Sequence, residues 1–239
     1  MIAFNKNYVI ALLASVIIAI ITVVNFCVML VGGYSKVWHK ISNPEYVARK
    51  EKDLFYVARI EHLKSLQINS ESIIMAGDSL TYNCEWHEML QNKNVVNRGI
   101  GYETSHGLLS RIEEYLGNKP HKIFVMVGVN DILNGETAIR ILDNIKGIVY
   151  KIKTLSPATE IYIQSVLPCS ASFGINHKIS FLNSEILKLS AKYGITYVNL
   201  YSNFIDKNEQ IINEYFIADG LHLTTIGYNT WALHISKYL

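Results

Sequence analysis

The chain opens with an uninterrupted apolar run. Val9 to Val31 are 23 residues without a charged side chain. At a rise of about 1.5 Å per residue, a helix of that length can cross a hydrocarbon core of roughly 30 Å. A buried core helix is one alternative, and a cleaved signal peptide, whose apolar region is usually about 7–15 residues, is another. The pattern predicts an uncleaved, single-pass transmembrane helix within an N-terminal membrane anchor at residues 1–35.

The next segment has an amphipathic pattern. Between Glu45 and Gln67, apolar side chains recur at helical spacing and charged side chains fill the positions between them. This predicts a connecting helix within residues 36–68. A solvated face is the simplest interpretation of its charges, and contact with a membrane surface is the alternative.

From residue 69 onward, short apolar runs alternate with amphipathic stretches. Strands that are separated by single helices favour right-handed crossovers, a parallel sheet and helices on both faces. We therefore predict one α/β domain over residues 69–239. Its expected strands lie at Ile73–Ala76, Val95–Val96, Ile123–Val127, Ile161–Ile163 and Ile195–Val198, and its expected helices at Ser105–Leu116, Thr137–Ile152, Lys178–Lys192 and Thr224–Leu239.

Charge and cysteine content exclude several kinds of partner. Lysine and arginine together number 22 against 20 acidic residues, and no basic run of the kind that follows a phosphate backbone occurs. A nucleic-acid partner is therefore not expected. The three cysteines form no C-x-x-C pair, and no metal or other cofactor is predicted. His87, His106, His121, His177 and His234 are likewise dispersed, without metal-ligand spacing.

A serine follows the first predicted strand directly. The run Ile73–Ala76 ends in Gly77, Asp78 and Ser79, and in parallel sheets chemistry gathers at the carboxyl ends of strands. Ser79 is therefore a candidate nucleophile, and Asp78 is expected to order the turn through backbone hydrogen bonds. A serine hydroxyl reacts slowly at neutral pH without a base, an orienting acid and oxyanion donors.

The last quarter of the chain offers the base and the acid. Asp219 and His222 stand three residues apart after the last predicted strand, just before a helix that Thr224 or Thr225 could cap. One loop can thus present both side chains to the same place. A carboxylate on Nδ1 fixes the tautomer of a histidine whose Nε2 takes the serine proton.

An asparagine follows the middle strand. Gly128, Val129, Asn130 and Asp131 come directly after Ile123–Val127. The Asn130 amide is a candidate oxyanion donor, and loss of such a donor typically costs about 10²–10³ in rate. The alternative is that Asn130 is an ordinary turn residue, and Asp131 is expected to support the turn.

Four ordered blocks resemble those of the SGNH (GDSL-type) hydrolases over residues 70 to 239. The resemblance implies a three-layer α/β/α, flavodoxin-like domain, a Ser-His-Asp triad without a metal, and hydrolysis of esters or thioesters. It assigns Ser79 as nucleophile, His222 as base and Asp219 as its partner, with the Ser79 backbone N–H and the Asn130 amide as oxyanion donors. The blocks are Gly77-Asp78-Ser79-Leu80, Asn97-Arg98-Gly99-Ile100-Gly101, Gly128-Val129-Asn130-Asp131 and Asp219-Gly220-Leu221-His222.

One position departs from the family pattern. After Gly101 the family usually has a second glycine whose N–H completes the oxyanion hole, and this chain has Tyr102. Because every residue except proline keeps its N–H, we expect Tyr102 still to donate and its ring to narrow the acyl pocket, which favours short acyl groups. Weakened activity is the alternative.

These features predict a membrane-anchored ester hydrolase that acts through an acyl-enzyme. O-acetyl groups on a glycan are the preferred substrate, and a lysophospholipase, a thioesterase or an acyltransferase with the same triad is the alternative. A catalytically silent, membrane-tethered glycan-binding module is the non-enzymatic alternative. Basic residues flank the apolar run on both sides and do not orient it. The hydrolase domain is expected outside the cytoplasm only because a glycan of the cell envelope is the preferred substrate. The sequence indicates no oligomeric state.

Overall fold

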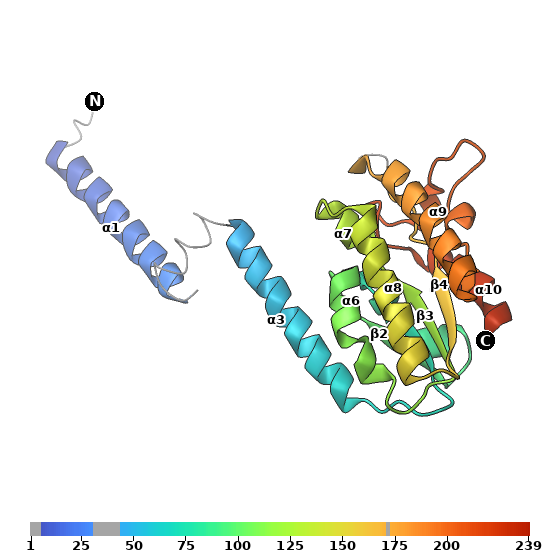
Figure 1. The fold of residues 1–239 in the computed structure, drawn as a ribbon. Helices are drawn as coiled ribbons and strands as arrows, with labels where there is room; N and C mark the ends of the chain where they lie inside the picture. The colour runs from blue at the N-terminus through green and yellow to red at the C-terminus, as the bar shows by residue number, and fades with distance from the viewer. Residues whose placement is uncertain (1–5, 31–43, 171–172) are drawn as a thin grey trace. The chain divides into compact units, whose positions relative to one another are not determined.

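The structure is a computed structural model that describes residues 6–30, 44–170 and 173–239 (Figure 1). Contacts divide the chain into two compact units, Met1–Phe55 and Tyr56–Leu239. Helix α1 (Lys6–Leu30) belongs to the first unit. Helix α3 (Pro44–Ser65) crosses the boundary, which therefore lies within the predicted connecting helix.

The predicted transmembrane span at residues 9–31 is not confirmed. Within the part of the chain that the structure describes, no helix combines the length and the apolar character needed to cross a bilayer. Val31 and the residues up to 43 lie outside the described residues. Attachment to a membrane therefore stays a prediction from the sequence.

The second unit is built on a five-stranded sheet in which every pairing is parallel, as the alternating pattern predicts. The strand order β2-β1-β3-β4-β5 is the flavodoxin-like order. Each strand is no more than five residues long. Three of them, β2, β3 and β4, include polar residues at their ends that the hydrophobic pattern did not predict as part of the strand. The strands are β1 (Ile73–Gly77), β2 (Val95–Gly99), β3 (Lys122–Met126), β4 (Glu160–Gln164) and β5 (Thr196–Val198).

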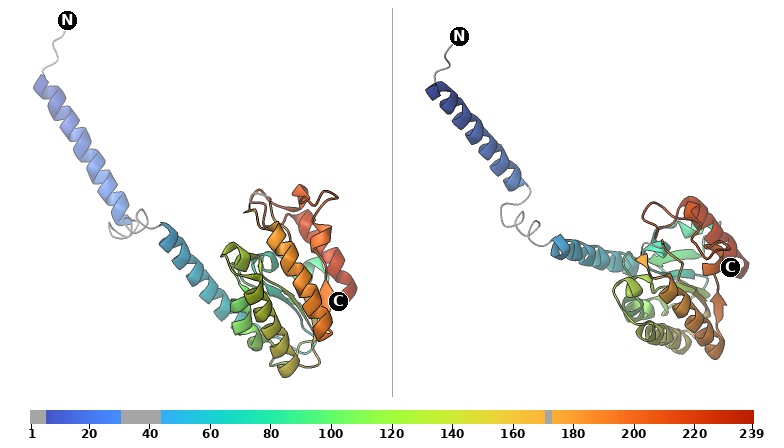
Figure 2. Two further views of the ribbon diagram at one scale, coloured as in Figure 1. Left: turned by 45° about the horizontal axis from the view of Figure 1, so that its top comes forward. Right: turned by 90° about the horizontal axis from the view of Figure 1, so that it is seen from above.

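Both faces of the sheet are covered, which is why residues 73–76 of β1 and 123–126 of β3 are apolar. Alternate residues of β1 face opposite sides: Ile74 belongs to a core shared with α6, α8 and α9, whereas Met75 belongs to a core shared with α4, α5 and α10. The two groups of helices lie on opposite sides of the sheet in Figure 2. The unit thus has three layers, α/β/α.

The long helices occur where their periodicity predicts them. Thr104, Thr137 and Thr224 cap α6, α8 and α10, each accepting a hydrogen bond from the first turn. Helices α4, α5 and α7 were not predicted, because four or five residues are too few to show a helical period. The helices are α4 (Ser79–Tyr82), α5 (Trp86–Met89), α6 (Ser105–Arg111), α7 (Val129–Leu133), α8 (Ala138–Leu155), α9 (Asn176–Tyr193) and α10 (Thr225–Ile235), with short 3-10 turns at Ile112–Tyr115, Tyr201–Asn203, Asn213–Tyr215 and Ser236–Tyr238.

The carboxyl ends of the central strands meet at one edge of the sheet. β1 runs into α4, β3 runs into α7, and β2 ends in a loop that leads to α6. Three chain segments that are far apart in sequence therefore deliver their polar residues to the same edge.

Candidate active site

Ser79 begins helix α4 in a tight turn, residues 77–80, which we call the nucleophile turn. Asp78 is the N-cap, and its Oδ1 accepts a hydrogen bond of 2.9 Å from the Leu80 N–H. This confirms the backbone hydrogen bond expected of Asp78. Ser79 is half-buried, and its own N–H lies in the first helical turn, where no intrahelical acceptor exists. The turn thus presents both the hydroxyl and a backbone donor.

The segment of residues 216–223, which we call the histidine loop, reaches the nucleophile turn. The Ser79 Oγ lies 2.9 Å from the Nε2 of His222, and the Nδ1 of His222 lies 2.7 Å from the Oδ2 of Asp219. When Nδ1 donates to Asp219, Nε2 is left to accept the serine proton. The three side chains therefore form a continuous hydrogen-bonded chain, as the sequence predicts.

Backbone contacts fix the shape of the histidine loop. The second oxygen of Asp219 accepts hydrogen bonds from the N–H groups of Leu221 (2.8 Å) and His222 (2.9 Å). Gly220 has a φ of 67°, and a Cβ there would lie 2.4 Å from the Cβ of Ser170. Glycine is required on both counts. Burial opposes ionisation of Asp219, but the hydrogen bonds from His222 and the backbone hold its pKa below the ordinary value.

Residues 100–105 lead from β2 into the first residue of α6 and contain the candidate oxyanion donor Tyr102, and we call this segment the oxyanion loop. Tyr102 has a φ of 64°, so it adopts the left-handed conformation that a glycine would take without strain. Its side chain is 54% exposed. Tyr102 thus has a backbone conformation that is unfavourable for a residue with a Cβ.

Asn130 lies on α7 and contacts the oxyanion loop. Its Nδ2 donates a hydrogen bond of 2.9 Å to the backbone carbonyl of Glu103. A side-chain amide has two N–H donors, so one is used to orient the group and the second is available for a substrate. The structure thus brings Asn130 to the same loop as Tyr102.

The supporting residues hold this arrangement together. The Asp131 carboxylate accepts from the N–H of Ser105 (2.9 Å) and from its Oγ (2.6 Å), which locks α7 to the oxyanion loop. Gly101 is buried directly before Tyr102. Burial, with a smaller contribution from charge repulsion by Glu103 and Asp131, raises the pKa of Asp78 to about 7 against the opposing effect of the hydrogen bond from the Leu80 N–H.

Sequence reasoning missed several residues of this site. Asn97 was quoted only as part of a block, yet its amide donates to three carbonyls at the end of α4 and beyond, those of Thr81 (2.9 Å), Tyr82 (3.0 Å) and Cys84 (2.9 Å). Glu103 was not singled out at all, although it is almost fully buried. A buried acid beside a predicted oxyanion residue leaves no local pattern that could have revealed it.

No metal-binding cluster is found among the residues that the structure describes, since no group of three or more histidine, cysteine or acidic side chains converges there. The dispersed histidines include His106, which lines a cavity of about 490 Å³ beside the oxyanion loop. The rest of that cavity is lined by Thr104, Asp131, Asn134, Glu136, Arg140 and Asn144. Every residue that lines this hollow has a polar side chain, and carbon atoms of these side chains make up much of the exposed surface.

Comparison with known proteins decides the family. The sequence profile of the GDSL-like Lipase/Acylhydrolase family matches residues 75–229, which include the nucleophile turn, the oxyanion loop and the histidine loop. The chain belongs to this family. Membership implies an ester hydrolase, which confirms the resemblance inferred from the four blocks.

Within the GDSL-like family, curated relatives and solved structures agree with this assignment. The platelet-activating factor acetylhydrolase IB subunit alpha1 of Rattus norvegicus is 26% identical over 164 residues, 65% of this chain and 69% of the relative. A Streptococcus pneumonia structure, provisionally assigned as a platelet activating factor, is 27% identical with a TM-score of 0.73 and covers 83% of this chain and 97% of that one.

A more distant structure shares the fold alone. A mutant acetyl-xylooligosaccharide esterase from Geobacillus Stearmophilus is 16% identical with a TM-score of 0.60, covering 71% of this chain and 94% of that chain.

Proposed function

We propose that this chain is a serine ester hydrolase that acts through an acyl-enzyme and removes short acyl groups, above all O-acetyl, from a glycan. The observation that carries the proposal is the hydrogen-bonded chain from Ser79 through His222 to Asp219 at the carboxyl edge of the sheet. In this mechanism His222 takes the proton of Ser79 as the hydroxyl attacks the ester carbonyl, and Asp219 stabilises the resulting imidazolium.

The negative charge that develops on the carbonyl oxygen needs donors. The backbone N–H groups of Ser79 and Tyr102 and the second N–H of Asn130 fill this role in the proposal. His222 then returns its proton to the leaving alcohol. Water activated by His222 finally attacks the acyl-enzyme and releases the acid.

Two observations support a short acyl group and a polar leaving group. Tyr102 is exposed and stands where the family usually has a glycine, and in the proposal its ring narrows the room beside the acyl carbon. The cavity beside the oxyanion loop is lined by side chains that hydrogen-bond well to sugar hydroxyls, such as His106, Asn134 and Arg140.

The second candidate is an acetyl ester on a phospholipid or related lipid, with thioesters and acyl transfer to an alcohol as further uses of the same triad. It is favoured by the curated relatives, which are platelet-activating factor acetylhydrolase subunits. A catalytically silent glycan-binding module is the non-enzymatic alternative.

A fluorophosphonate probe separates the enzyme from the silent module. Labelling of the folded wild-type chain that disappears in Ser79→Ala supports the enzyme, and absence of labelling in the wild type refutes it. Release of acetate from acetylated xylo-oligosaccharides is then compared with release from an acetylated ether phospholipid and with fatty acid from a long-chain lysolipid. Faster release from either lipid would reject the glycan as substrate.

The proposed location is a membrane, with the hydrolase domain outside the cytoplasm. Support comes only from the sequence, in which residues 9–31 carry no charged side chain, and from the envelope glycan proposed as substrate. We expect the full chain to resist extraction from membranes by alkaline carbonate, and a chain that starts at residue 36 to be released. Protease protection on sealed cells tests the orientation, since an external domain is digested and an internal one is spared.

A further inference from the structure

Glu103 is a buried carboxylate within the oxyanion loop, with only 1% of its surface exposed. Its Oε2 pairs with the Nε of buried Arg111 on α6. Its Oε1 accepts hydrogen bonds from the Tyr56 hydroxyl (3.0 Å) and from the Thr104 N–H (3.1 Å). Removing a carboxylate from water is costly unless such partners surround it, so the position of Glu103 is tightly specified.

The backbone of Glu103 contacts two candidate oxyanion donors. It is covalently joined to Tyr102 and hydrogen-bonded to Asn130. Its carbonyl accepts the Nδ2 of Asn130 at 2.9 Å. Its N–H, which donates to the Ile100 carbonyl at 3.3 Å, belongs to the peptide group that follows Tyr102. A shift of the Glu103 side chain would therefore move the acceptor that orients Asn130 and the peptide next to Tyr102.

Tyr102 makes this anchoring necessary. Its φ of 64° is unfavourable for a residue with a Cβ, and such conformations persist only where the surroundings over-determine them. The side-chain contacts of Glu103 fix the residue directly after Tyr102, and Asp131 fixes Ser105, three residues after Tyr102. Where the family usually has a glycine, this chain requires such anchors.

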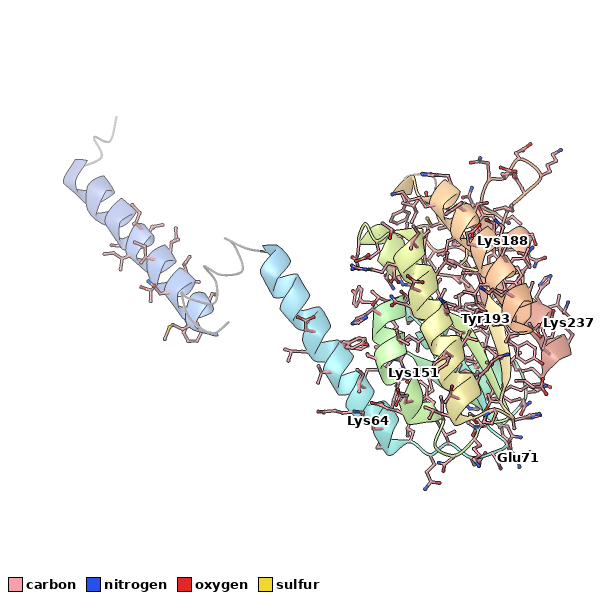
Figure 3. The ribbon with its side chains drawn as sticks, in the orientation of Figure 1. Lys64, Glu71, Lys151, Lys188, Tyr193 and Lys237 are labelled. Atoms are coloured by element: carbon pink, nitrogen blue, oxygen red, sulfur yellow. The ribbon has the colours of Figure 1, made fainter. Side chains whose placement is uncertain are left out.

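Tyr56 brings helix α3 into this arrangement. Burial raises the pKa of Tyr56, and the Glu103 carboxylate raises it further, so the phenol stays protonated and donates. The stretch of α3 that carries Tyr56 is held at two more places: Arg59 Nε donates to the Gly99 carbonyl at 3.4 Å, and Lys64, labelled in Figure 3, pairs with Glu114 at 3.0 Å.

The packing around the Tyr56–Glu103 hydrogen bond leaves no spare room. A Cβ at Gly107 of α6 would lie 2.1 Å from the Oε1 of Glu103 and 2.8 Å from the Tyr56 hydroxyl. Gly107 does not have a positive φ. Glycine is therefore needed there to leave room for the neighbouring side chains and not for its backbone conformation. The first turns of α6 are thus shaped around this hydrogen bond.

We propose that Glu103 is the positioning residue of the oxyanion donors and that Tyr56, from the helix before the hydrolase domain, completes its coordination. The inference rests on the proposed esterase function. The Tyr56 hydroxyl, on the part of α3 that belongs to the second unit, acts through Glu103 on Asn130 and Tyr102 without touching the substrate.

The test is a double-mutant cycle on hydrolysis of p-nitrophenyl acetate. Glu103→Gln and Tyr56→Phe are measured in the wild type and in an Asn130→Ala background, with Tyr150→Phe, an exposed tyrosine on α8, as the matched control. We expect Glu103→Gln to lower kcat about tenfold and Tyr56→Phe about threefold, with KM within about twofold, because both disturb a transition-state contact. In the Asn130→Ala background each loss should become smaller, because only the part that Glu103 transmits to Tyr102 remains.

A merely structural role gives a different result. Equal losses of kcat in both backgrounds, or no loss in either variant, would overturn the inference, and urea unfolding of every variant identifies losses that come from unfolding. If Glu103→Gln does not fold, Tyr56→Phe carries the test, since it deletes one hydroxyl. Wild-type chain without Ser79-dependent hydrolysis would instead refute the proposed function itself.

Discussion

Gly77→Ala places one methyl group between the nucleophile turn and the neighbouring strand. Gly77 ends β1 and pairs with Met126 of β3. A Cβ at this position would lie 2.3 Å from the Met126 carbonyl oxygen and 2.4 Å from the Oγ1 of Thr81. One of these neighbours is backbone in the centre of the sheet, and the other belongs to the helix that carries Ser79, so neither can turn away freely.

The displacement follows from these distances. Real Cβ atoms essentially never approach another heavy atom more closely than 3.0 Å, so the methyl group must push its neighbours away by at least 0.7 Å. Overpacking of this kind costs about 1–3 kcal/mol of unfolding free energy. A displacement of about 1 Å at a reacting group costs about 10²-fold in rate. We therefore expect the variant to be about 2 kcal/mol less stable and its turnover to be slower by roughly one to two orders of magnitude.

Gly117→Ala is the matched control. No atom lies within 4 Å of a Cβ built there, and the residue does not have a positive φ, so the change should leave kcat unchanged and stability equal or higher by up to about 1 kcal/mol. Both variants are compared by urea unfolding and by hydrolysis of p-nitrophenyl acetate. If Gly77→Ala matches Gly117→Ala in midpoint and in kcat, the packing argument for the nucleophile turn is wrong.

Three further substitutions test the site. Asn130→Ala should lower kcat by about 10²–10³ with little change in KM, and an unchanged kcat would exclude it as an oxyanion donor. Asp219→Asn should lower kcat by about 10³-fold or more at neutral pH, because the amide no longer selects the required His222 tautomer. Because the folded-state pKa of Asp78, about 7, exceeds its ordinary value of 3.8, the folded chain binds the extra proton and its unfolding free energy should fall as pH rises from about 4 to 7. Asp78→Asn keeps the cap and should flatten that slope in urea titrations at about pH 5 and about pH 7.5, on either side of the folded-state pKa, and an unaltered slope would contradict the assignment.

The sheet and the hydrogen-bonded chain were predictable because both leave local traces. Buried parallel strands are short apolar runs, and their alternation with amphipathic helices determines which ends share an edge. Ser79 directly follows such a run, and His222 stands just before a capped helix, so topology alone predicts that they meet. The carboxyl ends of β1 and β3 deliver Ser79 and Asn130 as expected.

The contacts that hold the oxyanion loop were not predictable in the same way. Tyr56 and Glu103 are 47 residues apart in the chain, and the amphipathic pattern of α3 marks only which side of the helix is apolar. The role of Asn97 depends on the carbonyls of Thr81 and Tyr82, in a helix too short to predict, and on that of Cys84 just beyond it. Buried polar contacts of this kind are specified by tertiary packing and not by any periodic pattern.

The two sides of the site are therefore stabilised by different interactions. The side with Asp219 and His222 is held by backbone hydrogen bonds within one loop and by the close approach of Gly220 to Ser170. The oxyanion side depends on side chains from three separate segments: the buried carboxylates of Glu103 and Asp131 and the half-buried phenol of Tyr56. Substitutions on the oxyanion side leave the hydrogen bonds among Ser79, His222 and Asp219 in place, so they should lower turnover while a fluorophosphonate still labels Ser79. Ser79→Ala should abolish both.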